Sequence, residues 1–204
     1  MTLPCPDWFT KAQARAAAMP PLAADRRWRA FNDPEYTCPC CGLKGPGLQD
    51  IAYDHPDAWP HGAHADQDEV IWQVGRDRLT SDLCRLKDAY FIRATLPMPL
   101  QGSDELFAYG PWARIAPEAF AAYADPQAPF DGCQAVLANA LPATPPMRPV
   151  ACAVMPSQPG TRPLLFAHDG PLRSGQEEGI SFDAILALYA AAGQDYRGHL
   201  GEKP

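Results

Sequence analysis

Three successive segments with a two-residue period constrain the fold of this chain most strongly. Leu79–Leu86, Tyr90–Leu96 and Phe107–Ile115 each alternate apolar and polar side chains, as half-buried strands do. A tight turn at Lys87-Asp88 joins the first two segments, and a loop beginning at Gly102 precedes the third. Because connections this short join antiparallel neighbours, the sequence predicts an antiparallel sheet.

Helices and further strands follow this region. Pro117 and Asp125 mark the start and end of one predicted helix, and Ser181 and Gly193 are a suitable N-cap and C′ residue for another. Three more strand-like runs are Gln134–Asn139, Val150–Met155 and Leu164–His168. We therefore predict an α+β fold, in which helices pack on an antiparallel sheet.

The two ends of the chain lie outside the predicted α+β domain. Residues 8–19 favour a helix, with Asp7 as its N-cap and Pro20-Pro21 as its stop. The predicted organisation is an N-terminal helical arm over residues 1–35, a single α+β domain over 36–192 that opens with a cysteine-rich turn, and a tail over 193–204.

Net charge, apolar runs and cysteine spacing indicate which kinds of partner and which cellular compartment to expect. The formal charge of −7 predicts no broad basic face for nucleic acid or anionic lipid, so neither is an expected partner. The longest apolar run, residues 184–192, is too short to span a bilayer. The seven cysteines lack the paired spacing of a secreted disulfide scaffold, which predicts thiols or metal ligands in a cytoplasmic protein.

The cysteine-rich turn has the pattern of half a zinc site. In Cys38-Pro39-Cys40-Cys41-Gly42, Cys38 and Cys41 have the Cys-x-x-Cys spacing that aims two thiolates at one ion. Pro39 fixes the chain direction, and Gly42 permits the positive φ that such a turn requires. No second Cys-x-x-Cys follows, so the remaining ligands must come from elsewhere, or the cysteines are reduced thiols without a metal.

Several residues can complete the site. Cys84 on the first strand is the predicted third thiolate, His61 and His64 can supply two imidazoles, and His55 can supply one. Three thiolates and one histidine would make a closed structural zinc site, whereas an open position would permit hydrolysis. His199 precedes a Leu200–Pro204 segment like a zinc-finger linker, but without the matching cysteines we expect a frayed tail there.

One predicted sheet face carries candidate binding residues. If Tyr90 and Ile92 face the core, Arg93 shares the opposite face with Trp112 of a neighbouring strand. Asp82, Arg93 and Trp112 are thus the candidate binding residues, with a protein as the expected partner. The alternative is a second core layer in which a carboxylate such as Asp82 or Asp104 holds Arg93.

The sequence contains no Gly-x-Ser-x-Gly, Ser-x-x-Lys or phosphate-binding glycine loop. Cys84 is the best candidate nucleophile, because Asp82 two residues earlier can orient a partner, although a nearby carboxylate also raises the pKa of a thiol. We therefore predict a non-enzymatic binding module with a structural zinc site. The alternative is a metal- or thiol-dependent hydrolase.

Part of the chain resembles a known family. The segments that carry the resemblance are Leu79–Cys84, Tyr90–Arg93, Gly102–Phe107, Tyr109–Trp112, Glu118–Phe120 and Gln176–Ser181. They are similar to the bacterial domain-of-unknown-function family 2199, over roughly residues 36–192. The resemblance implies a compact α+β domain that begins with the cysteine turn, and it implies no established activity. A histidine often follows this turn in the family, but Leu43–Gly47 stands there instead. Either His55, His61 or His64 replaces that histidine, or the site has lost its metal.

Overall fold

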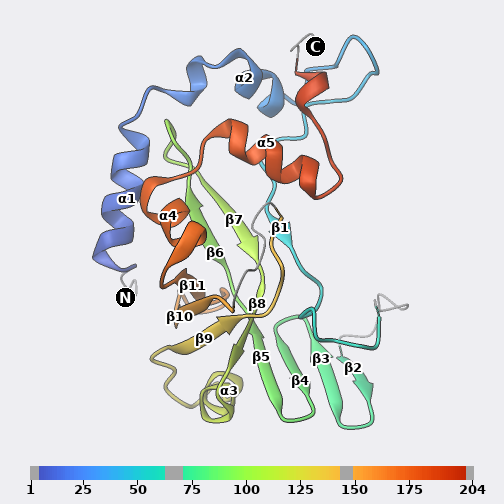
Figure 1. The fold of residues 1–204 in the computed structure, drawn as a ribbon, viewed down its shortest axis with the longest axis vertical. Helices are drawn as coiled ribbons and strands as arrows, with labels where there is room; N and C mark the ends of the chain where they lie inside the picture. The colour runs from blue at the N-terminus through green and yellow to red at the C-terminus, as the bar shows by residue number, and fades with distance from the viewer. Residues whose placement is uncertain (1–4, 63–70, 143–148, 201–204) are drawn as a thin grey trace.

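A computed structural model describes residues 5–62, 71–142 and 149–200, which form two sheets and the helices around them (Figure 1). The larger sheet has eight antiparallel strands in the order β11-β10-β9-β8-β5-β4-β3-β2. The smaller sheet has the order β1-β7-β6, in which β1 runs parallel to β7 and β6 runs antiparallel to it.

The strands are β1 Ile51–Ala52, β2 Ile71–Val74, β3 Asp77–Thr80, β4 Leu83–Leu86, β5 Ala89–Arg93, β6 Leu96–Pro99, β7 Leu106–Gly110, β8 Trp112–Ile115, β9 Cys133–Leu137, β10 Ala151–Met155 and β11 Leu164–Ala167. The helices are α1 Asp7–Ala17, α2 Arg26–Asn32, α3 Pro117–Ala124, α4 Gly170–Glu178 and α5 Phe182–Ala191, with short 3-10 helices η1 Leu22–Ala24 and η2 Arg197–His199. The predicted α+β fold is confirmed.

All three predicted strands are divided in the structure. The second, Tyr90–Leu96, ends as β5 at Arg93, and its last residue begins β6 of the smaller sheet. The first breaks at Ser81 and Asp82, so its halves are β3 and β4, paired antiparallel with each other. The third breaks at Pro111, where β7 joins the smaller sheet and β8 the larger one. Proline has no N–H to donate to a ladder, and the next residue, Trp112, donates its N–H to the Asn139 side chain instead of to a strand. The buried face shifts across the first break, from Leu79 to Cys84 and Leu86, which one continuous strand would not allow.

The predicted helix ends are largely confirmed. Ser181 accepts a hydrogen bond from the Ala184 N–H at the start of α5, and Gly193 follows the helix with φ +92°. Asp7 is the first residue of α1 and not its cap, because Pro6 holds the cap position. Helices α2 and α4 were not predicted. The N-cap of α2 is Asp25, whose carboxylate accepts from the Arg27 N–H and pairs with the Arg27 guanidinium at 2.8 Å.

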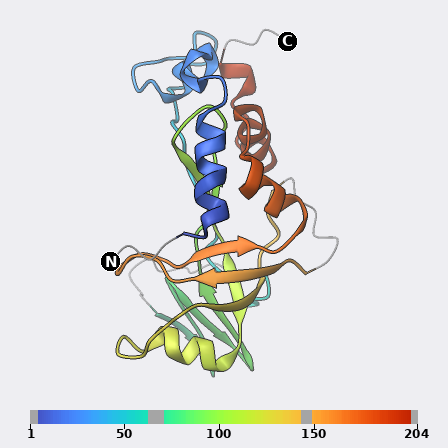
Figure 2. The same cartoon turned by 90° about the vertical axis from the view of Figure 1, so that its left-hand side faces the viewer.

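The helices other than α3 surround the smaller sheet (Figures 1 and 2), and the main core extends from among them onto the larger sheet, where it includes Ile92 and Val154. Phe31 of α2 is fully buried in this core and packs against Phe182 and Tyr189 of α5. A second, smaller core lies on the larger sheet under Trp59 and includes Leu79, Cys84, Leu86, Phe91 and Trp112. Helix α3 packs beside β5, where Phe120 meets Tyr90.

Gly102 joins the N-terminal arm to the smaller sheet and provides a test of this packing. Its φ is +79°, and a Cβ there would lie 2.2 Å from the Pro20 carbonyl oxygen. Gly75 also has positive φ, at +62°, but a Cβ there would meet nothing. We expect Gly75→Ala to cost about 1 kcal/mol of unfolding free energy from backbone strain, and Gly102→Ala about 3 kcal/mol, because the backbone must also shift. Urea denaturation of both variants measures the difference, and equal costs would contradict the close approach.

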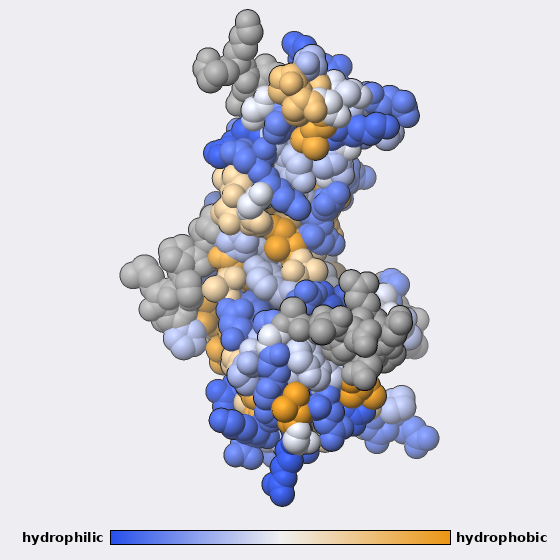
Figure 3. Space-filling model, turned by 90° about the vertical axis from the view of Figure 1, so that its right-hand side faces the viewer, coloured by the Kyte–Doolittle hydropathy of each residue, from blue (hydrophilic) through white to orange (hydrophobic). Residues whose placement is uncertain are grey.

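None of the helices in the described ranges combines the length and apolar character that crossing a membrane requires. In the view of Figure 3, apolar side chains form separate small groups among hydrophilic ones.

Candidate metal centre

Four potential metal ligands lie together at one end of the molecule. The sulfurs of Cys38, Cys40 and Cys41 and one ring nitrogen of His199 all lie within 4.8 Å of one another. The cysteines come from the turn between α2 and β1, and the histidine ends η2 near the C-terminus. The chain thus brings together residues that are separated by about 160 positions.

The backbone of the cysteine turn explains why the thiols converge. Thr37 and Lys44 form an antiparallel bridge, and inside it the Cys38 N–H donates to the Leu43 carbonyl at 2.8 Å. The Gly42 N–H donates back to the Cys38 carbonyl at 2.8 Å, with Gly42 at φ +75°. Residues with a side chain disfavour this φ, and the turn has a glycine at this position, as the sequence predicted.

Packing of the C-terminal segment places His199 beside the turn. The Tyr36 hydroxyl donates to the His199 carbonyl at 2.7 Å, and Leu200 is buried. Tyr196 packs its ring against Phe31 at 5.6 Å between centroids. Of the predicted frayed tail, Leu200–Pro204, the structure describes Leu200 alone, and this residue is packed instead of frayed. Apolar and hydrogen-bond contacts with distant parts of the chain, invisible in the local sequence, dock this segment.

The four ligand atoms are close together, although their spacing is not yet that of a tetrahedral ion. The Cys38 and Cys40 sulfurs are 2.8 Å apart, and the His199 Nδ1 is 3.1 Å from the Cys41 sulfur and 4.0 Å from that of Cys40. Zinc with bonds of about 2.3 Å to sulfur holds its ligand atoms about 3.5–3.8 Å apart in a tetrahedron. Small adjustments would therefore seat an ion among the four atoms, and the soft thiolate-rich donor set suits zinc.

Proton sharing within the cluster favours a thiolate. The hydrogen bond with Cys40 lowers the pKa of Cys38 to about 6, and the same contact raises the pKa of Cys40 to about 11. Of the two thiols, Cys38 is therefore the one that loses its proton more readily. This favours metal binding, since the thiolate is the ligand form.

The structure does not bring the other predicted ligands to this cluster. Cys84 is fully buried in the second core, and burial raises its pKa to about 12. The His61 Nε2 lies 3.0 Å from the Asp77 carboxylate, and the His55 Nδ1 lies 2.9 Å from the Pro56 carbonyl. His64 lies outside the described residues. Of the predicted ligands, Cys38 and Cys41 meet in the cluster, and Cys40 and His199 join them.

The candidate binding residues occupy different environments. Arg93 lies directly opposite Trp112 between β5 and β8, which is the predicted shared face. Trp112 is fully buried in the second core, however, and its Nε1–H donates to the Tyr53 carbonyl at 3.0 Å. Trp112 therefore has no exposed surface for a partner, and the alternative of a second core layer is correct for this residue. Asp82 is partly exposed and accepts a hydrogen bond from Arg162.

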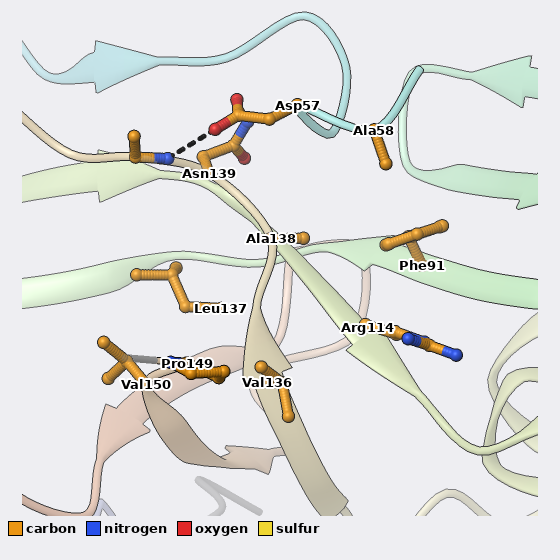
Figure 4. Close-up of a pocket in the computed structure, with 11 residues that line it drawn as sticks. Asp57, Ala58, Phe91, Arg114, Val136, Leu137, Ala138, Asn139, Pro149 and Val150 are labelled. Carbon is orange, nitrogen blue, oxygen red and sulfur yellow. Dashed lines mark hydrogen bonds between the residues drawn. The ribbon is translucent and has the colours of Figure 1, made fainter. Parts of the chain in front are cut away.

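An open groove also crosses strands β8 and β9, with Asp57, Phe91, Arg114 and Val136 among its lining residues (Figure 4). Its volume is about 490 Å³. At one end, the Asp57 carboxylate accepts from the Asn139 side chain at 2.8 Å and from the Ala140 N–H at 2.6 Å. These polar groups join two loops and are already paired, so the groove offers mainly apolar surface.

Comparison with known proteins identifies a family. Searches of curated proteins and of solved structures give no significant match to this chain. The profile of DUF2199, described as an uncharacterized protein conserved in bacteria, matches residues 37–180. This range contains the three clustered cysteines and most of both sheets, but it ends before His199. The chain belongs to domain-of-unknown-function family 2199, as its sequence motifs predicted.

Proposed function

We propose that this protein is a non-enzymatic binding module, stabilised by a structural zinc ion that Cys38, Cys40, Cys41 and His199 hold. The single observation that carries the proposal is the convergence of these four side chains from opposite ends of the chain. Zinc would link the C-terminal segment to the cysteine turn, next to the core residue Phe31. Free thiols throughout the described chain agree with a reducing compartment, and we place the protein in the cytoplasm.

The ligand set favours a structural role over hydrolysis. Three cysteines and one histidine fill a tetrahedral zinc and leave no position for an attacking water. The thiol alternative is also disfavoured, because Cys84 is fully buried and its raised pKa of about 12 keeps it protonated. Neither requirement of the hydrolase hypothesis, an open metal position or a reactive thiolate at Cys84, is supported.

Metal content tests the ligand assignment. We expect untagged protein to contain one zinc per chain by mass spectrometry, and we expect His199→Ala to lose it on dialysis against a weak chelator. Cys84→Ser is the matched control and should keep its zinc, because this thiol lies in the second core. Zinc that survives in His199→Ala but is lost in Cys84→Ser would show that the ligand set is wrong.

A further inference from the structure

Two sulfurs of the cysteine turn lie within reach of a covalent bond. The Sγ atoms of Cys38 and Cys40 are 2.8 Å apart. A disulfide bond measures about 2.05 Å, whereas two sulfurs bound to one zinc ion lie about 3.5–3.8 Å apart. The observed separation falls between these values, so the same two side chains can share a zinc ion or bond to each other after small shifts.

The cysteine turn is open to small oxidants from solvent. Figure 1 shows the segment that follows α2 beside the C-terminal segment, at one end of the molecule. Cys40 and Cys41 are exposed there, whereas Cys38 is buried. An oxidant therefore meets Cys40 before Cys38, and Cys38 is in contact with the sulfur that the oxidant modifies. Exposed thiols beside a second, resolving cysteine are typical of redox-sensitive sites.

The other four cysteines occupy less reactive environments. Cys84 is fully buried in the second core, and Cys152 is fully buried in the main core. Cys5 and Cys133 are partly buried and lie outside the cluster. Since thiols in apolar surroundings stay protonated and inert, oxidation should begin in the cysteine turn.

We propose that hydrogen peroxide converts Cys38 and Cys40 to a disulfide, and that this modification releases the zinc ion. The inference rests on the proposed zinc site and adds its regulation. The Cys40 thiolate attacks one peroxide oxygen, the O–O bond breaks, and a sulfenic acid forms as hydroxide leaves. The Cys38 thiolate then attacks the Cys40 sulfur and displaces a second hydroxide. The two sulfurs lose two electrons to the peroxide, and two protons from solvent convert both hydroxides to water.

The disulfide would remove two of the four zinc ligands. Cys41 and His199 fill only half of a tetrahedral site, which is too little to retain the ion. The C-terminal segment then loses its link to the turn through His199, although the Tyr36 hydrogen bond and the packing of Leu200 remain. Oxidation thus loosens this segment and leaves both sheets in place. A thiol reductant and zinc would restore the closed site, because thiol–disulfide exchange is reversible.

Zinc release and thiol counting test the proposal on the zinc-loaded chain. Hydrogen peroxide is added, free zinc is followed with a chromogenic chelator, and free thiols are alkylated in denaturant for intact mass spectrometry. We expect the loss of one zinc per chain and of two of the seven thiols, and recovery of both with dithiothreitol and added zinc. Hydrogen exchange at the His199 amide should become faster. Exchange at the Trp112 amide, which donates to Asn139 in the sheet, should not change.

Substitutions identify the reacting pair. Cys40→Ser should prevent the loss of paired thiols, whereas the matched control Cys133→Ser should still form the disulfide and release zinc. Cys41→Ser removes a ligand but keeps the reacting pair, so its disulfide should form even where zinc binding is weak.

The readouts separate this inference from the zinc assignment. Reduced protein that binds no zinc would contradict the proposed function, and thiol counts on the metal-free chain would still decide whether Cys38 and Cys40 pair. Zinc that stays bound under peroxide, with all seven thiols free, would overturn the redox inference alone. So would a disulfide that still forms in Cys40→Ser, or a gain of oxygen without pairing.

Discussion

Replacing Cys38 and Cys41 together by serine is expected to lower the free energy of unfolding by about 4 kcal/mol, the stabilisation that a metal at a thousand times its dissociation constant provides. The double variant removes two of the four ligand atoms, so the ion and its link to η2 are both lost. The eight-stranded sheet keeps its own contacts, and the loss should be confined to the end of the molecule that contains α2, α5 and the C-terminal segment. Denaturant unfolding, followed by hydrogen exchange at Phe31 and Tyr189, measures both effects.

Chelation provides the control for this prediction. Removing zinc from the unsubstituted protein should reproduce the destabilisation, and adding a chelator to the double variant should cause no further change. A double variant as stable as the unsubstituted protein, with zinc bound in the latter, would contradict a structural role for the ion.

Replacing Gln176 by leucine is expected to destabilise the fold by about 3 kcal/mol or more, because buried backbone groups would lose their partners. Gln176 lies in α4 and is completely buried. Its oxygen accepts from the Ala167 N–H at 2.9 Å, and its amide donates to the Pro97 and Leu165 carbonyls at 3.1 and 3.0 Å. This one side chain thus joins β6 of the smaller sheet to β11 of the larger sheet.

The matched substitution is Gln127→Leu, at an exposed position after α3. It should change the unfolding free energy by less than about 0.5 kcal/mol. Thermal and urea denaturation of the two variants compare the same chemical change in both settings. Similar stabilities for the two would show that the hydrogen bonds of Gln176 do not connect the sheets energetically.

The fold class could be predicted from the sequence because its signals are local. The strand-like runs in β3, β4, β5, β7 and β8, the tight turn at Lys87-Asp88 and the Ser181 cap of α5 each depend on a few neighbouring residues. The division between two sheets could not be predicted, because it depends on which distant strands pair with the chain on either side of Pro111 and of the bend after Arg93. Helix α4 was missed because its buried positions are Leu172 and the polar Gln176, so the sequence shows no apolar stripe.

The candidate metal centre could also be predicted only in part from the sequence. Cys38 and Cys41 have a recognisable spacing, but the residue that completes the cluster is distant in sequence. The packing of Tyr196 and Leu200 and the hydrogen bond from Tyr36 bring His199 back to the turn, and no local sequence pattern predicts these contacts. Cys84 was predicted as a ligand from its residue type alone. The register of β4 instead places its side chain in the second core.

X-ray absorption spectroscopy at the zinc edge tests the central claim most directly. The claim predicts three sulfur ligands at about 2.3 Å and one nitrogen at about 2.0 Å. In His199→Ala, any zinc retained under excess metal should lose the nitrogen and keep the three sulfurs. A first shell dominated by nitrogen and oxygen, a spectrum unchanged in His199→Ala, or purified protein that takes up no zinc would contradict the account.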